Sequence, residues 1–127
     1  MKLSRADLFR EKAYINGEWV DSENGDFIKV VNPATGVLIG HIPKMGRQET
    51  LSAIKAASDS FPMWRETTAK YRAGILRKFG ELMIKHQKDL ATIMTAEQGK
   101  PLAEAMGEIA YAASFLEWFG EESKRVY

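Results

Sequence analysis

The sequence predicts a chain of mixed strand and helix, in which two β-hairpins come first and amphipathic helices follow. Three observations support this fold class: an Asn-Gly pair at 16–17, a proline- and glycine-containing turn at 32–36, and a change of hydrophobic period near residue 45. Beyond that point apolar residues recur at three- and four-residue steps, which is the period of an α-helix. We therefore expect hairpins over about 13–42 and three helices over about 47–61, 68–97 and 101–125.

The strand signals lie in two short stretches. In the first, Asn16-Gly17 sits between two apolar pairs, and both central positions of a type I′ hairpin turn need a positive φ that Asn and Gly tolerate. In the second, residues 27–31 are rich in β-branched side chains. Pro33 keeps the preceding residue out of the helical region, and Gly36 supplies the freedom for the chain to return. A second hairpin is therefore expected.

The helical region is punctuated by glycine and proline. The first helix is expected to end near Pro62, because proline lacks the N–H donor that a helix interior uses. The second is expected to be one continuous helix to residue 97, with Gly99 as a left-handed cap and Pro101 opening the next helix. Its predicted apolar stripe, expected to pack against another element, comprises Tyr71, Ile75, Phe79, Leu82, Met83, His86, Leu90, Ile93 and Met94.

The third predicted helix is apolar around much of its circumference. Aromatic side chains Tyr111, Phe115 and Trp118 lie away from its main stripe, which suggests burial on more than one side. Such burial favours a piece of a larger protein over a free-standing domain. The main stripe comprises Leu102, Ala105, Met106, Ile109, Ala112, Leu116 and Phe119.

Composition excludes several classes of function. Lys and Arg number 18 against 17 Asp and Glu, so no electrostatic footprint for DNA, RNA or anionic lipid is expected. No apolar run approaches a membrane span, and the N-terminal residues do not resemble a secretory signal. The chain has no cysteine, which excludes disulfides and a thiol nucleophile within these residues. The default location is cytoplasmic.

Individual polar residues do not assemble into a catalytic or metal-binding pattern. His41 and His86 are the only histidines, and neither has a partner at metal-ligand spacing. Glu97 and Lys100 resemble an acid–base pair, but cap and connector chemistry around Gly99 accounts for them better. The glycines form neither of the two phosphate-binding sequence motifs, G-x-G-x-x-G and G-x-x-x-x-G-K-[ST]. We therefore expect no catalytic, cofactor-binding or metal-ligating residue in this chain.

Four blocks carry a family resemblance: Tyr14 to Trp19, Asn32 to Gly36, Glu97 to Ala105 and Phe115 to Glu122. In this order they resemble the N-terminal part of NAD(P)-dependent aldehyde dehydrogenases, most closely the succinate-semialdehyde branch, with glutarate-semialdehyde enzymes nearby. The resemblance implies the N-terminal portion of an α/β aldehyde-dehydrogenase-like fold. Residues 1–45 would be its strand and hairpin region and 46–127 its helical region, without the Rossmann core or the catalytic domain.

The same resemblance implies a function for an intact parent enzyme. That parent would oxidise succinate semialdehyde to succinate with NAD or NADP through a cysteine thioester, and would form a homo-oligomer. This chain alone would be inactive, with an aldehyde and the remainder of the parent as its partners. Tyr111 aligns approximately with a substrate-tunnel position of the family, and Phe115 lies one turn further on the same face. Core packing is the competing role for both residues.

Two alternatives remain open from the sequence. In the first alternative, the substrate of the parent enzyme is glutarate semialdehyde or an ω-amino aldehyde and not succinate semialdehyde. A chain that is naturally complete would instead be a non-catalytic helical interaction module, with Tyr111, Phe115 and Trp118 as its binding face.

Overall fold

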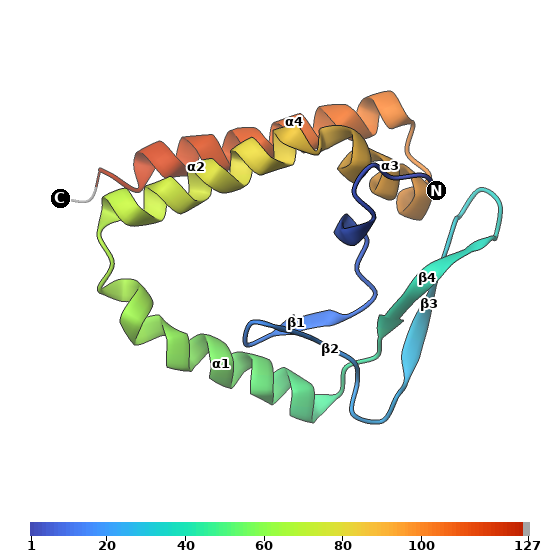
Figure 1. The fold of residues 1–127 in the computed structure, drawn as a ribbon, viewed down its shortest axis with the longest axis horizontal. Helices are drawn as coiled ribbons and strands as arrows, with labels where there is room; N and C mark the ends of the chain where they lie inside the picture. The colour runs from blue at the N-terminus through green and yellow to red at the C-terminus, as the bar shows by residue number, and fades with distance from the viewer. Residues whose placement is uncertain (126–127) are drawn as a thin grey trace. The chain divides into compact units, whose positions relative to one another are not determined.

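The computed structural model describes residues 1–125 (Figure 1). These residues divide into two compact units. One unit spans Phe9–Glu66, and the other combines Met1–Leu8 with the chain from Thr67 onward. The expected helical region extends to residue 127, and its last two residues lie outside the described part. Among residues 1–125, no helix has the length and apolar character that crossing a membrane requires.

Two antiparallel hairpins form the strand part of the first unit. Strand β1 (Ala13–Ile15) pairs with β2 (Glu18–Val20), and β3 (Phe27–Val31) pairs with β4 (Leu38–Pro43). Asn16 and Gly17 both have positive φ, at 51° and 87°, as the two-residue turn requires. Both predicted hairpins are confirmed.

The turn between β3 and β4 is organised by Asn32. Its side-chain oxygen accepts hydrogen bonds from the backbone N–H groups of Ala34 and Thr35, at 2.9 and 3.2 Å. Its backbone N–H donates to the carbonyl of Val37 at 2.9 Å, and Gly36 supplies a φ of 70°. Asparagine therefore closes the turn through its own side chain.

Helix α1 (Arg47–Arg65) is longer than expected, because it continues through Pro62. The predicted end near this proline is wrong. Proline removes only its own N–H donor, here the bond to the Ser58 carbonyl, and residues 63–65 still have helical donors of their own. At the other end, the Glu49 side chain accepts from the N–H of Gly46 at 2.9 Å and fixes the first turn.

The predicted helix over 68–97 is two helices, α2 (Ala69–Lys85) and α3 (Gln87–Gln98). The break is at His86, whose φ of −109° and ψ of 19° leave the helical region. No glycine or proline marks it, and the apolar residues on both sides keep the same period. Periodicity alone therefore missed the break. The end of α3 matches the prediction, since Gly99 is left-handed with a φ of 81°.

Helix α4 (Leu102–Glu122) follows Pro101 and lies antiparallel beside α2 (Figure 1). The core of this unit is formed by Ala91, Ala105 and Ile109, with methionines 83, 94 and 106 and Leu90 packed around them. Ala73 and Gly80 of α2 and Ala113 and Gly120 of α4 are also buried. The two helices therefore approach each other through small residues.

The predicted stripes need correction at several positions. Tyr71, Ile75, Phe79 and Leu82 of α2 are exposed, and α2 meets α4 through a different row that contains Ala73 and Gly80. In α4, Ala113 and Gly120 are buried where Ala112 and Phe119 were expected. The larger residues follow the helical period equally well, but they lie on a second apolar face. Small side chains define the packed face because they allow the helix backbones to approach closely.

Candidate functional site

The two residues that the sequence singles out, Tyr111 and Phe115, lie together on the outer face of α4. Their ring centroids are 4.8 Å apart, with the planes at 75°, which is an edge-to-face contact. Helical geometry places side chains four residues apart on the same face, one above the other. The helix therefore brings both residues into one surface feature.

Phe119 and Trp118 extend this feature, which we call the α4 aromatic face. Phe119 stacks on Phe115 with centroids 6.4 Å apart and planes at 17°. Tyr111 and Trp118 are 66% and 65% exposed, so both side chains are accessible to solvent in the described part of the chain. The helical period predicts Phe119 in the packed stripe of α4, but the ring is exposed. The signal for the aromatic face is its position four residues after Phe115.

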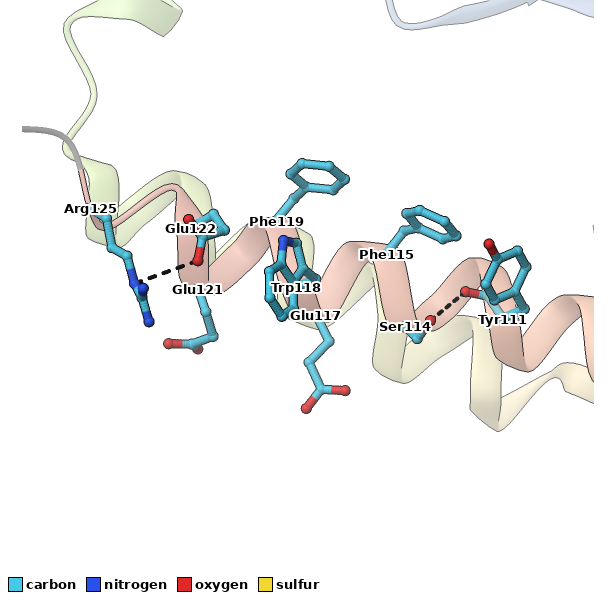
Figure 2. A pocket seen from close by; sticks show the side chains of 9 residues that line it. All are labelled: Tyr111, Ser114, Phe115, Glu117, Trp118, Phe119, Glu121, Glu122 and Arg125. Carbon is cyan, nitrogen blue, oxygen red and sulfur yellow. Dashed lines mark hydrogen bonds and ion pairs between the residues drawn. The ribbon is translucent and has the colours of Figure 1, made fainter.

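An open groove runs along this face and has a charged margin. Figure 2 shows the rings of Phe115 and Phe119 on one side of the helix and the carboxylates of Glu117 and Glu121 on the other. The groove is lined by Tyr111, Ser114, Phe115, Glu117, Trp118, Phe119, Glu121, Glu122 and Arg125.

The charged residues at the margin are partly paired with each other. Glu121 accepts two hydrogen bonds from the Lys124 ammonium, at 2.8 and 2.9 Å. These bonds lower the pKa of Glu121 below its ordinary value, because they favour the ionised carboxylate. Arg125 approaches Glu122 at 3.5 Å. The ionised form of Glu121 is therefore favoured at this margin.

The chemical capacity of the site is limited to contact and shape. Phenyl and indole rings offer apolar area, and the Tyr111 hydroxyl offers one hydrogen-bonding group. The Ser114 hydroxyl donates to the Tyr111 backbone carbonyl at 2.7 Å, so it is already engaged. The groove holds no paired base that would activate a nucleophile. It can line a passage or receive a packing partner.

The other polar candidates of the sequence do not join this site. Lys100 forms an ion pair with Glu108, and His41 lies in β4 with its ring edge-on to Phe27. His86 occupies the junction between α2 and α3. Within residues 1–125, no three His, Cys, Asp or Glu side chains are placed to hold a metal ion.

Comparison with known proteins identifies the family of this fold. A sequence profile described as the aldehyde dehydrogenase family matches residues 19–127. The chain belongs to the aldehyde dehydrogenase family. This match confirms the resemblance that the four sequence blocks indicated.

Two curated aldehyde dehydrogenases illustrate the similarity. Over all 127 residues the chain is 64% identical to a glutarate-semialdehyde dehydrogenase of Pseudomonas putida. It is 61% identical to a succinate-semialdehyde dehydrogenase [NADP(+)] of Escherichia coli K12 over the same 127 residues. In both cases it spans 26% of the relative, so it corresponds to about a quarter of their length.

A solved structure confirms the aldehyde-dehydrogenase-like fold. The crystal structure of an NADP-dependent enzyme of Escherichia coli superposes with a TM-score of 0.98 at 60% identity. The alignment covers 99% of this chain and 26% of the other. The fold class predicted from the sequence is therefore confirmed, with four α-helices after the strands within residues 1–125 in place of the three expected.

The aldehyde dehydrogenase family implies a nicotinamide cofactor, and the residues present do not fit one. A dinucleotide pyrophosphate is usually held by a glycine-rich turn between a strand and a helix. None of the ten glycines of this chain forms a G-x-G-x-x-G sequence. In residues 1–125 the sheets are two antiparallel hairpins, which lack the parallel strands of such a site.

Proposed function

We propose that the chain is the N-terminal part of a semialdehyde dehydrogenase that oxidises succinate semialdehyde to succinate with NAD⁺ or NADP⁺. The observation that carries this proposal is the identity of 61% to the Escherichia coli succinate-semialdehyde enzyme, which extends over all 127 residues. The oxidation would proceed through a thioester on a cysteine. Because this chain has no cysteine, the remainder of the enzyme supplies that nucleophile.

Glutarate semialdehyde is the second candidate substrate, supported by the 64% identity to the Pseudomonas putida enzyme. The two aldehydes differ by one methylene group. An enzyme distinguishes one methylene in an apolar passage by about 10- to 200-fold in kcat/KM. A preference of that size is measurable and assigns the substrate.

The test is a kinetic comparison on the full-length enzyme that contains this chain. Purified enzyme is assayed for NADH and NADPH formation with succinate semialdehyde, glutarate semialdehyde and an ω-amino aldehyde. We expect the highest kcat/KM with succinate semialdehyde. A higher value with glutarate semialdehyde reassigns the substrate, and no turnover of any of the three refutes the function.

Tyr111 and Phe115 are proposed to shape the path of the aldehyde in the full-length enzyme. Their edge-to-face pair presents exposed aromatic surface and one hydroxyl, which suits contact with a short carbon chain. Neither residue carries out a chemical step. In this role they change how well a substrate of a given length is bound.

Substitution of Tyr111 tests this positioning role. In the full-length enzyme, Tyr111→Ala should raise KM several-fold and change the ratio of kcat/KM between the two semialdehydes, with a smaller effect on kcat. Leu102→Ala is the matched control, since Leu102 is a half-exposed residue at the first position of α4, away from the aromatic face. Unchanged KM and unchanged substrate ratio in Tyr111→Ala would leave core packing as the role of this residue.

The parent enzyme is further proposed to be a cytoplasmic homo-oligomer. A reducing compartment keeps a cysteine nucleophile available as its thiolate. Sedimentation velocity of the full-length enzyme measures the oligomeric state directly.

A further inference from the structure

The hairpin formed by β3 and β4 has two outer edges, one along each strand, and they differ in whether a side chain binds their outward backbone groups. A strand at the edge of a sheet presents unpaired backbone groups that can pair with another strand. Among residues 1–125, β4 is the only strand that pairs with β3. A two-stranded sheet is marginally stable by itself. Its stability therefore depends on whether the backbone groups at each edge are paired.

One position on the outer edge of β4 is covered by a residue of the same unit. The Glu11 carboxylate accepts the outward backbone N–H of His41 at 2.7 Å. Gly40 makes this approach possible, because a Cβ there would lie 2.6 Å from the Glu11 carboxylate and 2.9 Å from the Phe9 ring. A further strand cannot pair at this position of β4 without displacing Glu11.

The outer edge of β3, unlike that of β4, presents outward backbone groups that no strand of residues 1–125 pairs with. Residue pairs in an antiparallel ladder alternate between hydrogen-bonded and non-hydrogen-bonded. Lys44 donates to the Asp26 carbonyl at 2.9 Å, and His41, opposite Lys29, donates to Glu11 and not to β3. The register then leaves the backbone groups of Phe27 and Lys29 directed outward from β3.

The side chains along β3 are suited to pairing with an apolar strand. Phe27, Ile28 and Val31 are each about half exposed, in a strand whose other members are Lys29 and Val30. A long apolar strand edge is normally paired or covered in a native protein. Lys29 is the only charged side chain of this strand.

A second copy of the chain is a poor partner for this edge. Lys29 is the middle residue of β3, so antiparallel pairing of two whole β3 strands would place the two Lys29 side chains opposite each other. Like charges directly opposite in a sheet are destabilising. A segment of different sequence, with a neutral or acidic residue at that position, avoids this repulsion.

We infer that the β3 edge receives a third strand, an extended apolar segment from the remainder of the aldehyde dehydrogenase polypeptide. The inference rests on the proposed function, since it requires a larger parent enzyme. The chain spans 26% of its curated relatives, so the remaining three quarters of such an enzyme are available to supply the strand. The added strand donates to and accepts from the backbone of Phe27 and Lys29 and covers neighbouring apolar side chains.

Amide hydrogen exchange on the full-length enzyme tests the added strand. The N–H groups of Phe27 and Lys29 should exchange at least about two orders of magnitude more slowly than unstructured amides, at every enzyme concentration. Free exchange at both positions would overturn the inference. Protection that disappears on dilution to monomers would also overturn it, because the partner would then be a second copy.

Substitution at Lys29 gives an independent test. Lys29→Pro removes the outward N–H, and Lys29→Ala is the matched control that keeps it. Proline is tolerated at a free edge but not inside a sheet, so Lys29→Pro should lower the Tm of the full-length enzyme by several degrees relative to Lys29→Ala. Equal Tm values would contradict the inference. Both readouts are made without substrate, so semialdehyde turnover is a separate result and the two hypotheses can fail independently.

Discussion

Asp89 is the individual residue that organises the N-terminal segment. It is 7% exposed, at the start of α3. Its two carboxylate oxygens accept the backbone N–H groups of Ser4 at 3.0 Å and Arg5 at 2.9 Å. Hydrogen bonds to a charged acceptor are about twice as strong as neutral ones. One side chain thereby anchors a segment 85 positions away in the sequence.

Removing this carboxylate should release the N-terminal segment. Asp89→Ala leaves two N–H groups without acceptors, and we expect a loss of about 1–3 kcal/mol in the free energy of unfolding. Urea titration measures the loss, and amide exchange at Ser4 and Arg5 should become fast. The control is Asp59→Ala, which breaks an exposed i,i+4 pair with Lys55 and should cost at most about 0.5 kcal/mol. Equal losses in the two variants would contradict the anchoring role.

Glu49 is the residue whose ionisation links the loop before β3 to α1. Its carboxylate accepts from the backbone N–H of Glu23 at 3.0 Å and from that of Gly46 at 2.9 Å. The bond from Glu23 is the largest cause of a pKa below the ordinary glutamate value of 4.5. A lowered folded pKa means that the ionised form stabilises the folded state.

The pH dependence of stability should therefore change in Glu49→Gln. The contribution of Glu49 is complete above pH 4.5, the ordinary value, and is lost as pH falls through the lower folded pKa. The unfolding free energy of the variant should fall less steeply over this acidic range. Urea titrations at a series of pH values measure the slope, with Glu18→Gln as the control. Identical slopes in Glu49→Gln and the wild type would exclude this linkage.

Among the elements, the close pairing of α2 with α4 depends on a small residue at two contact points, Gly80 and Gly120. A Cβ on Gly80 would lie 3.4 Å from the Ala113 carbonyl oxygen and 3.5 Å from the Cβ of Leu116. A Cβ on Gly120 would lie 3.6 Å from the Ala73 carbonyl oxygen. One methyl group fits at either position, and a longer side chain does not fit without separating the helices.

Two substitutions at Gly80 should therefore have opposite effects. Gly80→Ala fits and removes a poor helix former, so stability should be unchanged or rise by up to about 1 kcal/mol. Gly80→Leu should lower it by about 1–3 kcal/mol through overpacking. A Cβ on Gly74 of the same helix would meet nothing within 4 Å, so Gly74→Leu is the control. Thermal unfolding measures all three, and a tolerated Gly80→Leu would contradict close packing here.

At the scale of the whole molecule, exposed apolar surface is distributed over several helices. Tyr71, Ile75 and Phe79 form one exposed row on α2, in addition to the α4 aromatic face. Contiguous apolar surface of this kind marks a site of contact with other protein. It supports the proposal that this chain, which spans about a quarter of the length of its relatives, packs against the remainder of a larger enzyme.

The 127-residue chain studied alone should therefore bind the dye ANS and self-associate. Trp118→Gln should reduce both effects, because Trp118 is 65% exposed on the α4 aromatic face. Lys55→Gln on α1 is the control and should leave both unchanged. Fluorescence titration and sedimentation velocity provide the measurements. A monomer that unfolds in two states without binding ANS would instead favour the helical interaction module.

The tight turns, the Gly99 cap and the family could all be predicted from the amino-acid sequence. The Asn16-Gly17 turn, the Pro33–Gly36 return and the Gly99 cap follow from backbone preferences that single residues carry, and the structure has each of them. The four blocks likewise identified the aldehyde dehydrogenases. These features depend on neighbours in the chain, so they can be inferred without knowing what packs where.

The buried apolar face and the break in the second predicted helix, by contrast, could be seen only in the folded chain. The 3.6-residue period places Phe119 and Gly120 on adjacent faces but does not say which one meets α2. Close helix packing selects the small residue, so Gly120 is buried and Phe119 joins Tyr111 and Phe115 outside. Asp89 accepts a hydrogen bond from Ser4, and Glu11 accepts one from His41 at the edge of β4. Both bonds join residues far apart in sequence. Such contacts depend on where the folded chain brings distant groups together, and no local pattern encodes them.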